Sequence, residues 1–274
     1  MTKHSKELSK KPLVVVLGLD GCSWYLISRW IYKNELPNIR KIMKEGIYTT
    51  LESVLPILTC PAWKVISSGL SQHYIGAYGF IKPQIRKRNY IFVNSRLLKG
   101  KDVWDYLSDA KYKVCVVGVP YTYPPKKVNG LFISGFPITR DVDYTYPKKL
   151  KNILNKIDYR IHPRGLFAFL LRSRYALKEY KYQIDLRFAL IRTAIKLSYD
   201  FVFLVFFYVD KLAHYLWDDD LVLSVFKYLD KHLGELLNIL SSQGRPYVLM
   251  IISDHGCLLY TSDAADDGES VDLG

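Results

Sequence analysis

The chain has 274 residues, 49% of them hydrophobic, so it can bury the core of one large α/β domain or of two small ones. Its formal net charge of +13 favours anionic partners (phosphorylated substrates, nucleic acid or an acidic membrane surface), although an ordinary solvated surface can carry the same balance. The four cysteines include no CxxC pair, and their spacing argues against a disulfide framework. This fits a reducing compartment and a cytoplasmic protein.

Predicted strands and helices alternate along most of the chain. Residues 1–12 are polar and basic and are expected to be disordered. The apolar, β-branched run at 13–20 is typical of a central strand buried on both faces, and neither it nor the run at 201–209 is long enough to span a membrane. Further strands are predicted at 113–120, 130–136, 201–209 and 246–254, and helices at 36–46, 60–69, 101–110 and 219–241. The alternation predicts an α/β fold with a mostly parallel central sheet flanked by helices.

Residues 137–200 interrupt this alternation, because three helices are predicted there in succession. One of them carries a single apolar stripe, made of Ile184, Phe188, Ile191 and Ile195. We interpret the segment as a helical cap inserted into a catalytic domain that spans 13–256. Such a cap is expected to set substrate selectivity.

Three predicted strands end in an aspartate, namely Asp20, Asp210 and Asp254. Ligands gather at the carboxyl ends of strands in open α/β sheets, and a buried carboxylate there needs a partner or a metal ion. His255 follows Asp254 directly, and His214 lies four residues after Asp210, so that a helical turn would put both side chains on one face. Imidazole nitrogen and carboxylate oxygen together suit Zn²⁺ or Mn²⁺. Each aspartate alone could simply cap a helix, but the set favours a metal centre.

Thr59 stands just before a helix that opens with Pro61. A hydroxyl there faces backbone N–H groups and the positive end of the helix dipole, a position suited to a bound phosphoryl group. A divalent cation beside it could deprotonate the hydroxyl and make it a nucleophile. The alternative is that Thr59 only caps the helix.

Four motifs occur in an order that resembles the alkaline phosphatase superfamily: GLDG at 18–21, PILTCPAW at 56–63, DKLAH at 210–214 and SDHG at 253–256. The branch that the chain resembles is the type I phosphodiesterase/nucleotide pyrophosphatase branch, within its prokaryotic, largely archaeal group of predicted phosphohydrolases or phosphomutases. The ordered set is specific, although no single motif is. Trp63 stands where a sulfatase has arginine, so the resemblance does not extend to sulfatases.

The resemblance implies two divalent metal ions, Zn²⁺ or Mn²⁺, bridged by the substrate phosphate. It assigns Asp210 and His214 to one ion, and to the other ion it assigns Asp20, Thr59, Asp254 and His255. Thr59 is then expected to attack phosphorus and to form a covalent phospho-threonine, which water releases. The implied activity is hydrolysis of phosphodiester or pyrophosphate bonds in a phosphorylated small molecule, such as a nucleotide or sugar nucleotide.

Two other functions stay open at this point. A phosphomutase or phosphotransferase of the same superfamily would pass the phosphoryl group to an alcohol instead of water. A non-catalytic protein on the same scaffold could instead use the basic patches at 85–88 and 147–156 to bind nucleic acid or a membrane. Because such patches are usually solvated surface, no stable nucleic-acid complex is expected.

The tail at 257–274 carries five acidic residues and no basic one, unlike the rest of the chain. Codons for 257–266 can be written to match a transposase-end sequencing adapter, and codons for 271–274 to match a flow-cell adapter, both read in frame. We therefore expect the tail to be non-native and the natural sequence to have been cut near Gly256. The resemblance requires one more histidine for the Asp210 ion, and none follows His255. C-terminal strands are then expected to be missing, and the printed chain to be poorly stable and nearly inactive.

Overall fold

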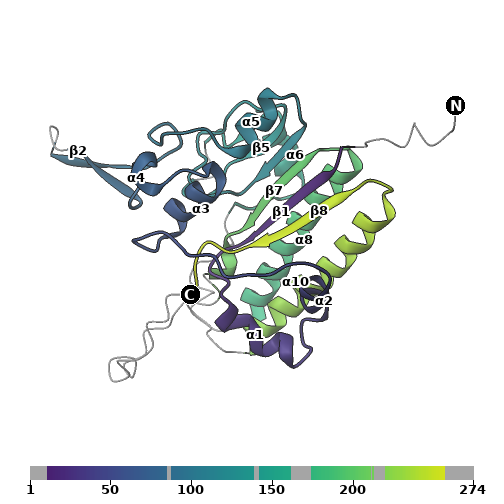
Figure 1. The fold of residues 1–274 in the computed structure, drawn as a ribbon. Helices are drawn as coiled ribbons and strands as arrows, with labels where there is room; N and C mark the ends of the chain where they lie inside the picture. Colours follow the sequence, from purple (N-terminus) through teal and green to yellow (C-terminus); the bar gives the residue numbers. More distant parts are fainter. Residues whose placement is uncertain are drawn as a thin grey trace, which may run out of the picture.

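A six-stranded sheet with helices on both faces forms the body of the protein (Figure 1). The computed structural model describes residues 11–84, 88–138, 142–161, 174–210, 212 and 220–256. The strand order is β6-β5-β4-β7-β1-β8, and every neighbouring pair is parallel except β5 and β6. The predicted α/β class with a mostly parallel, helix-flanked sheet is confirmed. The strands are β1 (Leu13–Leu19), β4 (Val114–Val117), β5 (Gly130–Ile133), β6 (Thr145–Tyr146), β7 (Phe201–Phe206) and β8 (Tyr247–Ile252).

The first strand, β1, lies between β7 and β8, as its continuous apolar sequence predicts. All six residues of β7 are buried, and so are all but Val14 of β1. In β8, side chains alternate between partly buried and exposed, with Val248 47% and Met250 45% exposed. The buried strands β1 and β7 therefore form the rigid centre from which the carboxyl ends of the sheet are positioned.

Helices surround this sheet, and a separate two-stranded hairpin, β2 (Ile81–Gln84) with β3 (Asn89–Phe92), extends from it (Figure 1). Helix boundaries agree with the expected ranges to within a few residues for the four helices predicted outside 137–200. The described helices are α1 (Trp24–Tyr32), α2 (Pro37–Glu45), α3 (Thr59–Ser68), α4 (Gln72–Ile75), α5 (Val103–Asp109), α6 (Leu150–Lys156), α8 (Arg174–Lys196) and α10 (Asp220–Ser242).

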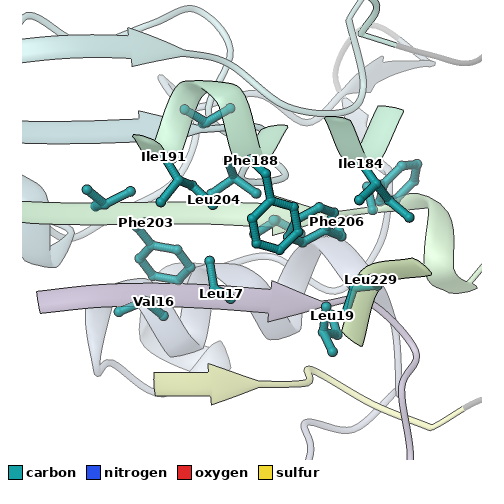
Figure 2. Packing of buried hydrophobic residues seen from close by; sticks show 14 of the residues in the cluster. Val16, Leu17, Leu19, Ile184, Phe188, Ile191, Phe203, Leu204, Phe206 and Leu229 are labelled. Atoms are coloured by element: carbon teal, nitrogen blue, oxygen red, sulfur yellow. The ribbon is translucent and has the colours of Figure 1, made fainter. Parts of the chain in front are cut away.

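The two faces of β7 show which helices cover which side of the sheet. Successive side chains of a strand point to opposite faces. Phe206 packs on Phe188 of α8, with ring centroids 5.5 Å apart, and Figure 2 shows this cluster beside Leu204. Phe203 points the other way and meets two tryptophans edge-on, Trp63 of α3 and Trp104 of α5. The helix α8 therefore covers one face of the sheet, while α3, which begins at Thr59, packs on the opposite face.

The segment 137–200 differs from the expected arrangement of three helices. It contributes an antiparallel edge strand, β6. The helix α8 runs unbroken from the described end of the second predicted helix through the third. The stripe of Ile184, Phe188 and Ile191 is buried against the sheet and α10 (Figure 2). The periodicity identified the buried face correctly, and that face packs against the α/β core.

Several expectations fall wholly or mostly on residues that the structure does not describe. These are the disorder of residues 1–12, the basic patch at 85–88, the position of His214 and the nature of the tail at 257–274. Among the described helices, none is long and apolar enough to cross a membrane.

One carboxylate from α10 fixes the start of α2. The N-cap position, Leu36, offers no side-chain acceptor to the first N–H groups of that helix. Asp230 supplies both oxygens instead: the backbone N–H groups of Asn38 and Ile39 donate to it at 3.1 and 2.8 Å, and the side chain of Asn38 donates at 2.8 Å. Asp230 is 2% exposed, so these bonds are shielded from water.

Replacing Asp230 by alanine is therefore expected to lower the free energy of unfolding by about 3 kcal/mol, because several buried donors lose a charged acceptor. Urea denaturation measures this loss. The control is Glu45→Ala on the exposed end of α2, where the ion pair with Lys41 is long, at 4.0 Å, and worth less than about 0.5 kcal/mol. Equal losses in the two variants would contradict the capping role.

Candidate functional site

The carboxyl ends of β1 and β8 bring two of the predicted aspartates together. Asp20 follows β1 directly and is fully buried, and Asp254 follows β8 by two residues and is 4% exposed. The backbone N–H of Gly21 donates to Asp254 Oδ1 at 3.2 Å, which ties the two strand ends to each other. A serine from the loop before α3, Ser53, donates to the carbonyl of Asp254 at 2.7 Å. The parallel pairing of neighbouring strands is what makes these distant residues meet.

Thr59 reaches the same place from α3. Its Oγ1 lies 3.0 Å from His255 Nε2, and the side chain is 8% exposed. The N-cap of α3 is Leu58, and Thr59 is the first residue of the helix, so Thr59 does not cap α3. This removes the capping alternative and leaves the hydroxyl at the positive end of the helix dipole, facing the imidazole.

The ring of His255 is oriented by its other nitrogen. Nδ1 lies 2.8 Å from the carbonyl oxygen of Gly256, which can only accept, so Nδ1 carries a proton. In the neutral ring with this tautomer, Nε2 is an acceptor to which the hydroxyl of Thr59 can donate. Fixing one nitrogen by a backbone carbonyl is the usual way in which proteins orient a histidine toward a metal ion.

Three acceptor groups converge at this point, one each from Asp20, Asp254 and His255. The atoms through which these groups could bind a metal ion all lie within 4.8 Å of one another. Asp254 Oδ2 lies 3.2 Å from His255 Nε2, and Asp20 Oδ1 lies 3.9 Å from it. Two carboxylates and an imidazole acceptor at such distances repel one another in a buried setting, and a divalent cation would relieve that repulsion. The nitrogen and oxygen donors fit Zn²⁺ or Mn²⁺.

The electrostatic cost of this arrangement appears in the pKa of Asp254. Burial raises the pKa of its carboxyl from an ordinary value near 3.8 to about 6, and the negative charge of Asp210 adds to the increase. A positive charge on His255, present only when its ring is protonated, and the N–H of Gly21 act in the opposite direction but do not cancel the increase. A carboxylate held in this way binds a proton or a cation readily.

Asp210 lies next to this group. The sequence predicts it at the end of a strand, but the structure places it beyond that end. The strand β7 ends at Phe206, and the apolar run continues into a buried helical turn before Asp210 is reached. A Cβ on Gly21 would lie 2.5 Å from Asp210 Oδ1, so the two chain segments touch. Asp210 is outside the group of three converging donors, and its predicted partner, His214, is outside the described residues.

Two cysteine thiols lie beside the site, but neither offers a thiolate. Burial, followed by the charge of Asp254, raises the pKa of Cys22 to about 12. The pKa of Cys60, which follows Thr59 directly, is raised well above its usual range by burial and by the charges of Asp20 and Asp254. Both thiols therefore stay protonated, and the hydroxyl of Thr59 is the better placed nucleophile.

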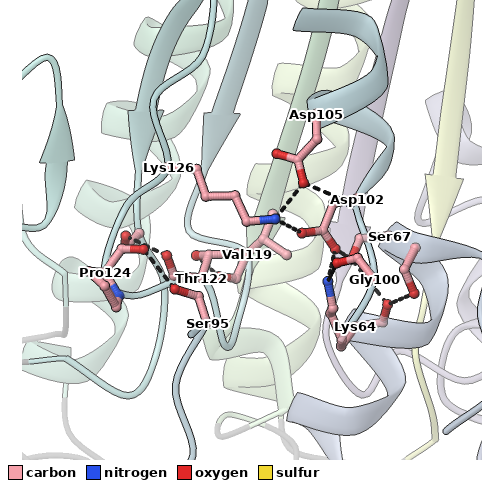
Figure 3. Close-up of polar contacts among 12 residues, drawn as sticks. Lys64, Ser67, Ser95, Gly100, Asp102, Asp105, Val119, Thr122, Pro124 and Lys126 are labelled. Atoms are coloured by element: carbon pink, nitrogen blue, oxygen red, sulfur yellow. Dashed lines mark hydrogen bonds and ion pairs between the residues drawn. The ribbon is translucent and has the colours of Figure 1, made fainter. Parts of the chain in front are cut away.

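A buried polar network, which the sequence did not reveal, anchors the far end of α3 (Figure 3). Asp102, at the start of α5, accepts hydrogen bonds from Lys64 and from Ser67, the latter at 2.8 Å. Its other oxygen accepts from Lys126 at 2.8 Å, and Lys126 also pairs with Asp105. The cavity beside it measures about 10 Å³, room for one water at most. The network is therefore an anchor for the helix that carries Thr59. The hint in the sequence was Lys64, the single charged residue of α3.

Residues 14–267 match the family model described as type I phosphodiesterase / nucleotide pyrophosphatase. The match extends past Gly256 into the tail that is predicted to be non-native. No curated protein matches the chain.

Solved structures with the same fold include two hydrolases. Phosphonoacetate hydrolase from Sinorhizobium meliloti 1021, in complex with phosphonoformate, superposes with a TM-score of 0.65 at 16% identity, over 90% of this chain and 56% of that chain. Murine ectonucleotide pyrophosphatase / phosphodiesterase 5 gives a TM-score of 0.56 at 17% identity, over 89% and 57%. At these identities the likeness shows the fold. The chain spans a little over half the length of these proteins.

Gly21 offers a test of the junction between Asp20 and Asp210. It has φ +66°, and its Cβ position is blocked by Asp210, so alanine there adds a clash to the cost of left-handed backbone. Gly21→Ala is expected to weaken binding of Zn²⁺ or Mn²⁺, measured by titration calorimetry, and to lower the free energy of unfolding by about 2–3 kcal/mol. Gly69→Ala is the matched control, because φ is +65° and nothing lies near its Cβ position. It should cost only about 1 kcal/mol and leave cation binding unchanged. If both variants bound the cation equally well, the clash at Gly21 would have no effect on the metal site and the prediction would be wrong.

The raised pKa of Asp254 predicts how the stability of the metal-free protein depends on pH. The folded state holds a proton at Asp254 up to about pH 6, whereas the unfolded chain releases it near pH 3.8, so stability falls as the pH rises through this window. Asp254→Asn removes that loss. It should therefore be more stable than the wild type at pH 7.5, by on the order of 2 kcal/mol, with the advantage shrinking toward pH 4. Denaturation in a chelator at several pH values measures it. A pH-independent difference would contradict the raised pKa.

Proposed function

The chain belongs to the type I phosphodiesterase / nucleotide pyrophosphatase family, and from that membership we propose that it is a metal-dependent phosphohydrolase with Thr59 as its nucleophile. The observation that carries the proposal is the meeting of Thr59 Oγ1 with His255 Nε2 at 3.0 Å, beside the carboxylates of Asp20 and Asp254. Hydrolysis of phosphodiester or pyrophosphate bonds is the activity that this site and the family support best.

Two divalent ions, Zn²⁺ or Mn²⁺, complete the proposed site. One would be held by Asp20, Asp254 and His255 together with Thr59, and the other by Asp210 with His214. Bound cations lower the pKa of a neighbouring hydroxyl and offset charge on phosphoryl oxygens. The convergence of buried acceptors supports the first site, and the closeness of Asp210 to Gly21 supports a second site beside it.

Thr59 is proposed to carry out the covalent step. Its Oγ1 releases a proton to solvent and forms a bond to phosphorus, while the opposite P–O bond breaks and its electron pair leaves with the leaving oxygen. Water then forms a bond to phosphorus, the P–Oγ1 bond breaks, and Oγ1 takes up a proton from that water as the phosphate product leaves. The first turn of α3 presents its positive end to the phosphoryl group throughout. The burial of Thr59, 8% exposed, limits the access of bulk water.

The substrate is proposed to be a phosphorylated small molecule such as a nucleotide or sugar nucleotide. The net charge of +13 favours an anionic substrate. Solved structures of the same fold carry phosphonoformate in one case and AMP in another, the latter in an inactive threonine-to-alanine variant of the murine protein. A cytoplasmic location is proposed from the three buried free cysteines, Cys22, Cys60 and Cys115.

A single-turnover measurement suits a test of this covalent step, because formation of the covalent intermediate on Thr59 can be read even when its release is slow.

Thr59→Ala is expected to abolish the burst of nitrophenol that the wild type releases from bis(4-nitrophenyl) phosphate in the presence of Zn²⁺ or Mn²⁺. The rate should fall by about 10³-fold or more, because the nucleophile is lost. Thr50→Ala, an exposed threonine in the preceding loop, is the control and should keep the burst. Mass spectrometry should find a 4-nitrophenyl phosphate group on Thr59 of the wild type. An undiminished burst in Thr59→Ala would exclude Thr59 as the nucleophile. Transfer of the group to added glycerol instead of water would identify a phosphotransferase.

A further inference from the structure

Trp63 lies fully buried one helical turn after Thr59, and its indole reaches a proposed metal ligand. Its Nε1 donates a hydrogen bond of 2.7 Å to Asp20 Oδ2. An indole N–H can only donate, so Trp63 cannot itself hold a cation. Its contact therefore acts on the carboxylate of Asp20 and not on the cation itself.

Helical spacing places Trp63 on the same face of α3 as Thr59, since residues four apart are neighbours on a helix surface. The hydroxyl of Thr59 meets His255 at 3.0 Å, and the indole of Trp63 meets Asp20 at 2.7 Å. One rigid helix therefore contacts both strand ends of the site, the end of β8 through Thr59 and the end of β1 through Trp63.

The sheet is shaped to receive this indole. A Cβ on Gly18 of β1 would lie 2.3 Å from Trp63 Cη2 and 2.8 Å from its Cζ3, so only glycine leaves room for the ring. On the other side the ring meets Phe203 of β7 edge-on, with centroids 6.2 Å apart. The packing fixes the indole plane and therefore the direction of its N–H.

From this geometry we propose that Trp63 is a positioning residue for a divalent cation, an inference that rests on the proposed function. Its N–H engages Oδ2 of Asp20 and turns Oδ1 toward His255 Nε2, 3.9 Å away. Asp20 then offers the cation one defined oxygen. A hydrogen bond to the second oxygen of a ligating carboxylate both orients it and satisfies it in a buried setting.

Trp104 of α5 is a natural control within the same chain. It is also fully buried and also packs edge-on against Phe203, with centroids 5.7 Å apart. Among the described residues, however, its Nε1 has no hydrogen-bond partner. Replacing either tryptophan by phenylalanine removes similar buried area, but only Trp63→Phe removes a bond to Asp20.

The test is the Zn²⁺ affinity of the full chain, measured by competition with a chromophoric chelator. Trp63→Phe should bind Zn²⁺ about 10- to 100-fold more weakly than the wild type, the usual effect of losing a contact behind a metal ligand. Trp104→Phe should bind like the wild type, although urea unfolding should show that both variants lose stability. The nitrophenol burst of Trp63→Phe should recover only when the Zn²⁺ concentration is raised, whereas Trp104→Phe should show its burst at the Zn²⁺ concentration that suffices for the wild type.

Asp20→Asn separates the two ways in which the idea could fail. If Asp20→Asn loses Zn²⁺ affinity but Trp63→Phe does not, the positioning role is wrong and the metal site stands. If Asp20→Asn binds Zn²⁺ like the wild type, the proposed metal site itself is wrong. Should Trp63→Phe not fold, 3-benzothienylalanine at position 63 keeps the shape of the ring and lacks only the N–H. Wild-type affinity in that variant would overturn the role of the hydrogen bond.

Discussion

The crowding of acceptor groups at one edge of the sheet is the constraint on which the rest of the site depends. Asp20, Asp254 and His255 place two carboxylates and an imidazole nitrogen within 4.8 Å of one another, away from water. Such a cluster opposes folding unless donors or a cation compensate it. The raised pKa of Asp254 shows that the N–H of Gly21 compensates only in part. The protein thus maintains a locally unfavourable arrangement, which is common where a site must bind a cation.

Rigid packing of the strands and the helix around the site makes such an arrangement possible. The central strands β1 and β7 are buried along almost their whole length, so their ends cannot move apart to relieve the repulsion. The helix α3 is fixed at two places, by Trp63 against Asp20 and by Lys64 against Asp102. Burial lowers the pKa of Lys64, a sign that placing this charge inside the protein has a cost. The anchoring of α3 therefore trades some stability for a defined position of Thr59.

Much of this site could be predicted from the sequence, because its signals are local. A long β-branched run followed by Asp20 predicts a central strand with a carboxylate at its end, and the rule for parallel sheets then brings Asp254 and His255 to the same edge. Pro61 marks the start of a helix, which gave the position of Thr59 without a structure. These inferences needed only the neighbours of each residue and one rule of topology.

The remaining features depend on contacts that no local pattern encodes. An apolar stripe on a helix predicts a buried face, but not which element of the fold packs against it. The apolar run before Asp210 continues past the end of β7, since burial and not strand geometry keeps it apolar. The partner of Trp63 is 43 residues away in the chain, and that of Lys64 is 38 away. In an apolar helix that carries a nucleophile, one buried indole and one buried lysine are conspicuous, because each needs a partner that the helix cannot supply. Those two residues were therefore the places in the sequence where long-range positioning of the site could have been suspected.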